Sequence, residues 1–212
     1  MIKAIIFDMD GVLQDSETIC DKVWQIVGHE MGLASTEEAI QQCRGMNRAD
    51  TQFELKKIYG NDFDSISFLN RCTQKFIEIE NSTGIPLMPF AKECLAYLKP
   101  KYKIALASST RGVHVQRQMT SAGLIGYFET LTTGDMVTHG KPDPEIYLMA
   151  CKSLALKPEE CVAIEDSPNG VRSAFAAGMK VIMVPDKIQP DEEMKNKTWK
   201  IVDSLEALYN IL

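Results

Sequence analysis

Two aspartates separated by one residue follow a short apolar run near the start of the chain. Asp8 and Asp10 come directly after residues 4–7, which are all apolar. Side chains two positions apart in a strand point the same way, so both carboxylates would emerge together where the strand ends. Gly11 lets the chain turn sharply away. Mg²⁺, which prefers oxygen ligands, would relieve the repulsion between them, whereas an ordinary Asp-rich turn is the alternative.

A hydroxyl group and an ammonium group occur at comparable places further along. Ser108 closes the apolar residues 104–107, where a hydroxyl with nearby backbone N–H groups can hold a phosphate oxygen. This serine and its two polar neighbours can equally cap the next helix. Lys141 precedes two prolines that flank Asp143 and stiffen the segment. Its ammonium can stabilise charge on a transferring phosphoryl group, although most lysines are solvated surface charges.

A second acidic pair completes the set. Glu165 and Asp166 directly follow the apolar residues 162–164, and burying such charges is costly unless they meet a cation or water. Favourable interaction with the dipole of the next helix is the alternative. All four signals lie at the carboxyl ends of expected strands, and acids, hydroxyl and ammonium complement one another. Together they indicate a phosphoryl-transfer site with a metal.

The elements that must position these residues can be read from the apolar pattern. Continuous apolar runs, as opposed to alternating ones, indicate strands covered on both faces, which is typical of parallel sheets. Helical patterns alternate with these strands, and such alternation implies a doubly wound sheet. We therefore expect an α/β, Rossmann-like doubly wound parallel sheet. The expected strands are residues 4–7, 104–107, 162–164 and 181–184, with weaker candidates at 130–132 and 200–202.

The expected helices of this core have recognisable ends. One covers about residues 89–98, with Phe90, Cys94, Leu95 and Leu98 on a common side. Others are expected over residues 112–122 and 168–177, and glycines past their ends are typical of helix C-termini. The remaining helix is expected to begin at Asp143, a capping aspartate before proline. The two terminal glycines are Gly123 and Gly178.

Residues 15–86 break the alternation, because they contain no convincing strand and read as four helices. We expect residues 1–14 with 87–212 to form the catalytic core and residues 15–86 a helical cap. An insertion after the first strand would lie above the carboxyl ends of the sheet, where open α/β folds bind ligands. The expected helix signals are Ser16 and Gly32 for the first helix, a capping box of Ser35 and Glu38 for the second, Asn47 and Gly60 for the third, and residues 65–81 for the fourth.

Composition narrows the class of protein. The chain has 212 residues, of which 45% are hydrophobic and 25% charged, with a formal net charge of -6. An acidic balance argues against nucleic-acid or anionic-membrane partners, which need clustered Lys and Arg. The six scattered cysteines include no C-x-x-C pair and suit a reducing compartment. The apolar N-terminal run is too short for a signal peptide, so a cytoplasmic location is expected.

With these motifs, the sequence resembles the haloacid dehalogenase superfamily. The matching motifs are residues 7–13 (FDMDGVL), Ser108, Lys141 and residues 165–170 (EDSPNG). The resemblance extends over essentially the whole chain, including the helical insertion after the first motif. It looks most like the branch that contains β-phosphoglucomutases and small sugar-phosphate phosphatases.

The resemblance implies roles for the acidic residues. Asp8 would attack phosphorus and form an aspartyl-phosphate intermediate. Asp10 would protonate the leaving oxygen and then activate the water that clears the intermediate. Mg²⁺ would be bound by the Asp8 carboxylate, the main-chain carbonyl of Asp10 and Asp166, while Glu165 would support the metal's waters.

It also implies roles for the polar and basic residues. Ser108 and Lys141 would hold the phosphoryl oxygens and offset charge on the nucleophile. Ser109 and Arg111 are expected to bind substrate beside Ser108. In the cap motif of residues 45–48, Arg48 is expected to contact the substrate or a second phosphate; a solvated residue at a helix start is the alternative.

The activity follows from which residues are present. Asp10 favours phosphate esters over dehalogenation, because an alkoxide leaving group needs an acid and a halide does not. Phosphonate cleavage is disfavoured, since its cap motif and Schiff-base lysine are not evident. Cys20 stands where related mutases carry histidine, which favours hydrolysis. We therefore expect a monomeric Mg²⁺-dependent phosphatase acting on a small phosphorylated metabolite, a sugar phosphate by preference. A β-phosphoglucomutase-type mutase is the alternative. A catalytically retired fold used for binding is the third possibility.

Overall fold

The computed structural model describes residues 1–44, 46 and 48–212 of the chain. These residues form two compact units, one made of Met1–Asp15 with Pro86–Leu212 and the other of Ser16–Ile85. The first is the core unit and the second is the helical unit. Within the described residues, no helix has both the length and the apolar character needed to cross a membrane.

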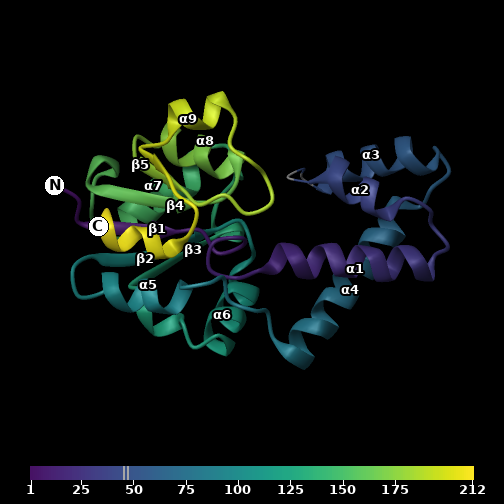
Figure 1. Ribbon diagram of the computed structural model, residues 1–212, viewed down its shortest axis with the longest axis horizontal. Helices are drawn as coiled ribbons and strands as arrows, with labels where there is room; N and C mark the ends of the chain where they lie inside the picture. The colour runs from purple at the N-terminus through teal and green to yellow at the C-terminus, as the bar shows by residue number, and fades with distance from the viewer. Residues whose placement is uncertain (45, 47) are drawn as a thin grey trace. The chain divides into compact units, whose positions relative to one another are not determined.

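The core unit contains a six-stranded sheet in which every pair of neighbouring strands is parallel. The strand order β3-β2-β1-β4-β5-β6 places the first strand of the chain in the middle of the sheet (Figure 1). This confirms the predicted α/β class and doubly wound parallel sheet. The strands are β1 (Ala4–Phe7), β2 (Lys103–Ser108), β3 (Thr130–Thr133), β4 (Cys161–Glu165), β5 (Lys180–Met183) and β6 (Lys200–Ile201).

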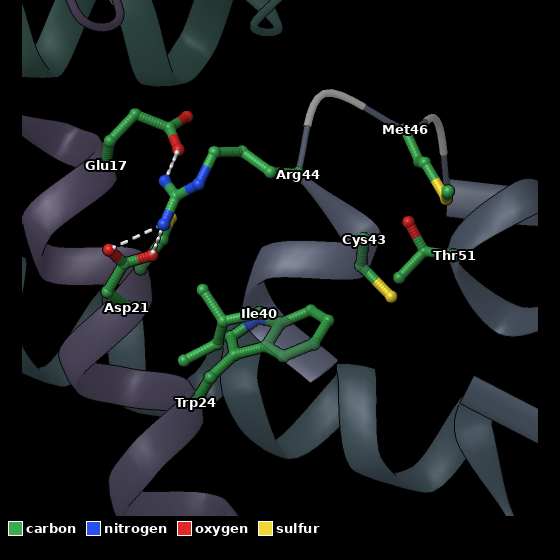
Figure 2. A pocket seen from close by; sticks show the side chains of 9 residues that line it. Glu17, Asp21, Trp24, Ile40, Cys43, Arg44, Met46 and Thr51 are labelled. Carbon is green, nitrogen blue, oxygen red and sulfur yellow. Dashed lines mark hydrogen bonds and ion pairs between the residues drawn. The ribbon is translucent and has the colours of Figure 1, made fainter. Parts of the chain in front are cut away.

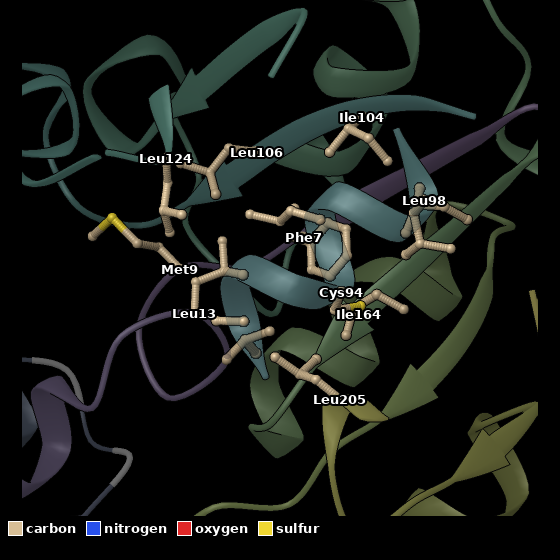
Figure 3. Close-up of a cluster of buried hydrophobic side chains, with 14 of the residues drawn as sticks. Phe7, Met9, Leu13, Cys94, Leu98, Ile104, Leu106, Leu124, Ile164 and Leu205 are labelled. Carbon is tan, nitrogen blue, oxygen red and sulfur yellow. The ribbon is translucent and has the colours of Figure 1, made fainter. Parts of the chain in front are cut away.

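Both faces of this sheet are covered, which explains the continuous apolar runs. In β1, Ile5 and Phe7 pack into one apolar layer, while Ala4 and Ile6 pack into the layer on the other face. Figure 3 shows the first layer, where Phe7 lies among side chains from neighbouring strands and α5. The core helices are α5 (Ala91–Leu98) and α6 (Gly112–Ser121) in the first layer, and α7 (Glu145–Ser153), α8 (Pro168–Ala176) and α9 (Glu192–Lys197) in the second.

The ends of the core helices can be compared with the signals that predicted them. Short 3-10 turns complete the core unit. Gly123 and Gly178 have φ angles of 67° and 85°, which confirms both as C-terminal glycines. Phe90 was wrongly placed on the buried face of α5, because it precedes the helix in a left-handed conformation and is 39% exposed. The 3-10 turns are η1 (Ile125–Tyr127), η2 (Gly134–Met136), η3 (Pro158–Glu160) and η4 (Leu205–Asn210).

Asp143 lies one residue further from α7 than predicted. The helix begins at Glu145 with Pro144 before it, yet the Asp143 carboxylate still accepts a hydrogen bond from the Glu145 N–H at 2.9 Å. The prediction of a start at Asp143 was therefore wrong in position, while the capping contact itself is present.

The helical unit has its own apolar core, built where its four helices meet. Trp24 packs edge-on against Phe68 at 5.1 Å between ring centroids, and Val27, Leu55 and Cys72 belong to the same buried cluster. The unit contains only helices among its described residues, as predicted. These helices are α1 (Ser16–Glu30), α2 (Thr36–Cys43), α3 (Arg48–Tyr59) and α4 (Ser65–Thr83).

The predicted capping box of Ser35 and Glu38 is wrong. Ser35 does precede α2, but it has a left-handed backbone with φ of 56° and makes no side-chain cap hydrogen bond. A capping serine normally has an extended backbone that aims its oxygen at the first turn. The predicted cap of α3, Asn47, lies outside the described residues.

Replacing Leu106 with alanine tests the core. Leu106 is fully buried on β2, so Leu106→Ala removes packed methyl groups and leaves a cavity. We expect the free energy of unfolding to fall by about 2–5 kcal/mol, measured by urea denaturation followed by circular dichroism. Leu148→Ala, at a position that is 44% exposed, should change it far less. Equal losses in the two variants would contradict the assigned core.

Candidate active site

The register of the central strands brings their carboxyl ends to the same level. Phe7, the last residue of β1, pairs with Leu106 of β2 and with Ile164 of β4. The next residue, Asp8, continues this alignment, because its N–H donates to the Ile164 carbonyl at 3.0 Å. Ser108 and Glu165 end the two flanking strands. Side chains from three strands therefore emerge at one edge of the sheet.

Lys141 contacts all three of these chain segments. Its Nζ lies 2.6 Å from Asp8 Oδ1 and 2.6 Å from Glu165 Oε1, and it donates to the Ala107 carbonyl at 3.2 Å. The lysine side chain is 8% exposed, and the Asp8 and Glu165 side chains are 9% and 0% exposed. Lys141 is thus a buried cation between two carboxylates, and the alternative of a solvated surface lysine is wrong.

Burial changes the proton affinity of the groups in this cluster. The pKa of Asp8 is raised to about 7: loss of water around the carboxylate is the main cause, Lys141 acts in the opposite direction, and the charges of Glu165 and Asp10 add to the rise. For Lys141, burial would lower the pKa, but the charges of Asp8 and Glu165 outweigh this and raise it. The lysine therefore stays protonated, and an ionised Asp8 is favoured by any further cation nearby.

Glu165 is held by donors on both carboxylate oxygens. Its Oε1 accepts from Lys141 and from the hydroxyl of Tyr147, each at 2.6 Å. Its Oε2 accepts from the backbone N–H of Asp166 and from the hydroxyl of Ser167, each at 3.2 Å. The Glu165 carboxylate contacts Lys141 as well as lying close to Gly170 in the first turn of α8, so the helix dipole alone does not account for its position. Its fully bonded carboxylate is suited to orient neighbours.

Two glycines make room for the acidic side chains. A Cβ added at Gly170 would lie 2.0 Å from the carboxyl group of Glu165. A Cβ added at Gly11 would lie 2.4 Å from Asp166 Oδ2, and the φ of 76° there is itself unfavourable for other residues. The glycines of the first and last motifs are therefore required by close approach of the candidate site residues.

The acids form a cluster of oxygen atoms suited to a metal. Asp8, Glu165 and Asp166 each offer a carboxylate oxygen, and these atoms all lie within 4.8 Å of one another. Oxygen ligands without nitrogen or sulfur suit Mg²⁺. The close approach of Gly11 brings the backbone of the first motif to Asp166 as well. The residues present thus fit a magnesium site.

The loop after β2 supplies further polar groups, one of which contacts Asp10. Ser108 is fully buried, and its Oγ accepts from the backbone N–H of Thr110 at 3.1 Å. The Thr110 hydroxyl donates to Asp10 Oδ2 at 2.9 Å. The helix-capping alternative fails here, because the first N–H of α6, that of Gly112, donates to Asp135 Oδ1 at 2.7 Å. Ser108 therefore does not cap α6.

The residues predicted to bind substrate are less closely gathered. Ser109 and Arg111 lie in the same loop after β2, and both are exposed. Arg48 belongs to the helical unit, where its Nη2 donates to Asn70 Oδ1 at 2.7 Å. The structure thus places Ser109 and Arg111 beside Ser108 along the chain, and it pairs Arg48 with a neighbouring helix.

A family profile described as haloacid dehalogenase-like hydrolase matches residues 5–184 of this chain. The chain belongs to the haloacid dehalogenase-like hydrolase family. Its relatives include the putative phosphatase YhcW of Bacillus subtilis, 34% identical over 89% of this chain and 86% of that protein. They also include the phosphorylated carbohydrates phosphatase of Thermotoga maritima, 32% identical over 85% of this chain and 84% of that protein.

Solved structures agree with this assignment. A crystal structure described as a putative β-phosphoglucomutase from Thermotoga maritima superposes with a TM-score of 0.83 and 29% sequence identity, covering 99% of this chain and 98% of that one. The similarity includes both the sheet and the helical insertion. Membership of the family and the phosphatases among the relatives support the prediction of a phosphoric monoester hydrolase.

The helical unit of this haloacid dehalogenase-like hydrolase contains a pocket of about 210 Å³. Figure 2 shows Arg44 on one wall, between two carboxylates of α1. Its guanidinium lies 3.4 Å from Glu17 Oε2 and 2.9 Å from Asp21 Oδ2. Trp24 and Cys20 also line this pocket.

Sequence reasoning missed three residues of this hydrolase. Tyr147 lies on the buried face of α7 and could not be told from an ordinary core residue. Thr110 was considered only as a possible helix cap. Arg44 precedes the motif that drew attention to Arg48, and the signal available for it was a charged residue directly before a glycine.

Replacing Lys141 with methionine tests the buried ion cluster. The change leaves Asp8 and Glu165 buried without their cation, so we expect the metal-free protein to lose about 3–5 kcal/mol of unfolding free energy. Urea denaturation in EDTA would measure it. Lys195→Met is the matched control, because it breaks an ion pair with Glu192 of the same 2.6 Å length between exposed side chains, where a much smaller loss is expected. Similar losses would contradict the assigned role.

Proposed function

We propose that this protein is a Mg²⁺-dependent phosphatase of small sugar or polyol phosphates, with Asp8 as its nucleophile. The observation that carries the proposal is the position of the Asp8 carboxylate, 2.6 Å from the buried ammonium of Lys141 and close to the oxygen atoms of Glu165 and Asp166. The ammonium beside this carboxylate can stabilise negative charge on a phosphoryl group. Asp10, an acid that an alkoxide leaving group needs and a halide does not, favours phosphate esters over carbon–halogen chemistry.

The metal assignment distinguishes the acids by their partners. Both oxygens of Glu165 already accept hydrogen bonds from protein donors, so we assign it to orient the site and not to bind the ion directly. Asp8, Asp166 and the main-chain carbonyl of Asp10 would hold Mg²⁺. The ion, when bound, offsets negative charge on the nucleophile and the phosphate.

The chemical steps follow from these assignments. An oxygen of Asp8 forms a bond to phosphorus while the bond from phosphorus to the ester oxygen breaks. Asp10 gives its proton to that departing oxygen, so the leaving group departs as an alcohol. Asp10, now ionised, takes a proton from water as the water oxygen attacks phosphorus. The phosphorus–oxygen bond to Asp8 then breaks and inorganic phosphate leaves.

Lys141 and Ser108 contribute charge and position. The ammonium of Lys141 reduces repulsion between the Asp8 carboxylate and the dianionic ester, which is the main obstacle to their approach. The buried hydroxyl of Ser108 and the N–H groups of its loop would hold a phosphoryl oxygen, and Ser109 and Arg111 would bind nearby parts of the substrate. Rigid attachment to strand ends keeps this geometry fixed.

The proposed substrate class rests on the relatives and on the helical unit. One relative is named for phosphorylated carbohydrates. The pocket of the helical unit offers two carboxylates, a guanidinium and an indole, which suit hydroxyl groups and the apolar face of a sugar. We also propose that residues 1–14 with 87–212 form the catalytic core and that residues 15–86 form the cap. Arg48 is proposed to contact the substrate, and the protein is proposed to be a cytoplasmic monomer.

A mutase is the second candidate, favoured by the superposition on a structure described as a putative β-phosphoglucomutase. Incubation with β-glucose 1-phosphate, with and without a bisphosphate primer, separates the two. Free phosphate without isomer is the result expected here, whereas glucose 6-phosphate formed faster than free phosphate would favour the mutase. A screen of sugar and polyol phosphates for phosphate release then identifies the best alkyl substrate.

Asp8→Asn tests the nucleophile. We expect phosphate release to fall to background, because an amide oxygen is a far weaker nucleophile and the covalent intermediate cannot form. Release from the best screened ester would be measured, with the melting temperature as a check on folding. Asp203→Asn, at an exposed position, should keep activity. Turnover by Asp8→Asn at the wild-type rate would exclude the mechanism.

Asp166→Asn tests the metal site. Isothermal titration calorimetry with Mg²⁺ should show affinity reduced roughly tenfold or more relative to wild type, because a charged oxygen ligand becomes a neutral amide. Wild-type phosphate release should stop in EDTA and return on adding Mg²⁺. Unchanged Mg²⁺ affinity in Asp166→Asn would refute the assignment, and full activity in EDTA would refute the metal requirement.

A further inference from the structure

Thr110 joins two parts of the candidate active site that are far apart in the sequence. Its hydroxyl donates to Asp10 Oδ2 at 2.9 Å, although the two residues are separated by 100 positions. Its backbone N–H donates to Ser108 Oγ at 3.1 Å. One residue thus contacts both the proposed acid and base and the hydroxyl proposed to hold phosphate.

The backbone around Thr110 is anchored from the next strand connection. The Gly134 N–H donates to the Thr110 carbonyl at 3.0 Å, and a Cβ at Gly134 would lie 2.0 Å from the Ser109 carbonyl oxygen. Asp135 accepts from the Gly112 N–H at 2.7 Å just beyond. Since a β-branched side chain has few rotamers, this fixed backbone gives the threonine hydroxyl a defined direction.

Asp10 needs such a contact because of where it lies. It follows β1 within a turn, in which the Gly11 N–H donates to the Gln14 carbonyl at 2.9 Å. A carboxyl group there has two side-chain torsions to settle, yet a general acid must reach the leaving oxygen within hydrogen-bond distance. A hydroxyl both donates and accepts, so Thr110 can keep the contact when Asp10 gains or loses its proton.

We propose that Thr110 is a positioning residue that holds the Asp10 carboxyl group for protonation of the leaving group. The proposal rests on the proposed function, in particular on Asp10 as the general acid. It has a consequence that a merely structural role lacks. Loss of the hydroxyl should impair substrates whose leaving group needs a proton and spare those whose leaving group departs as a stable anion.

The experiment compares two substrates in the full-length enzyme with Mg²⁺. One is the best alkyl phosphate of the screen, which leaves as an alcohol, and the other is acetyl phosphate, which leaves as acetate. The value of kcat/KM reports the steps up to departure of the leaving group, so hydrolysis of the intermediate does not enter. For Thr110→Val we expect kcat/KM to fall roughly ten- to hundredfold for the alkyl phosphate and less than about threefold for acetyl phosphate.

Three further variants make the result decisive. Thr110→Ser keeps the hydroxyl and should stay within about threefold of wild type for both substrates. Thr120→Val, the same change at an exposed position of α6, should have no effect. Thr110→Ala replaces Thr110→Val if melting curves show that the valine variant does not fold. Asp10→Asn should show the same substrate difference in larger form.

The outcomes separate this proposal from the proposed function. Equal losses for both substrates, or no loss, in Thr110→Val would overturn the positioning role while wild-type turnover and the behaviour of Asp10→Asn stay as expected. An Asp10→Asn variant with wild-type kcat/KM for the alkyl phosphate would instead refute Asp10 as the acid. Absence of phosphate release from every ester in the screen would refute the phosphatase itself.

Discussion

The ion cluster of Lys141, Asp8 and Glu165 is the interaction on which the site depends. Two carboxylates buried this deeply would repel each other, and their loss of water would be costly, unless a cation lay between them. Lys141 supplies that cation, with both contacts at 2.6 Å. It balances one of the three negative charges of Asp8, Glu165 and Asp166, and the two that remain match a divalent ion. The same charge arrangement that keeps the folded protein stable therefore prepares it to bind metal and phosphate.

The parallel sheet makes this cluster possible. Because β1 lies between β2 and β4 in register, residues 99 and 157 positions from Phe7 lie level with it at the ends of their strands. Both faces of the sheet are covered by apolar layers, so polar side chains of these strands can leave the core only at the strand ends. The concentration of charged and hydroxyl groups at one edge is thus a consequence of how the strands are buried.

The sequence was informative where a residue type has few uses, and less so where geometry decides. Continuous apolar runs allow few structures other than covered strands, and Asp8, Lys141, Glu165 and Asp166 could be grouped because charges at strand ends need partners. Ser35 misled because its capping signal is local, while the backbone there adopts a left-handed conformation and the side chain makes no cap hydrogen bond. Phe90 was predicted to share the buried side of α5, but it precedes that helix with a left-handed backbone.

Tyr147 could not be found from sequence for a different reason. Its ring belongs to the buried layer of α7, as its place in the apolar pattern indicates, and only its hydroxyl reaches Glu165. The apolar pattern of the sequence reports only the buried ring of such a residue, and it does not reveal the contact made by its hydroxyl group. Thr110 is comparable, because a threonine before a helix is ordinary, and its contact with Asp10 depends on how two distant loops fold.

The geometry of the site requires its glycines as well as its charged residues. Gly170 lies where any side chain would meet the Glu165 carboxyl group, and Gly11 lies where one would meet Asp166. A sequence that kept every acid and the lysine but had larger residues at these two positions would still match the charged part of the motifs. Its carboxylates would be displaced, however, and the 2.6 Å contacts of Lys141 require them to stay where they are. The chemistry of this site is therefore specified both by its charged residues and by the glycines beside them, which have no side chain.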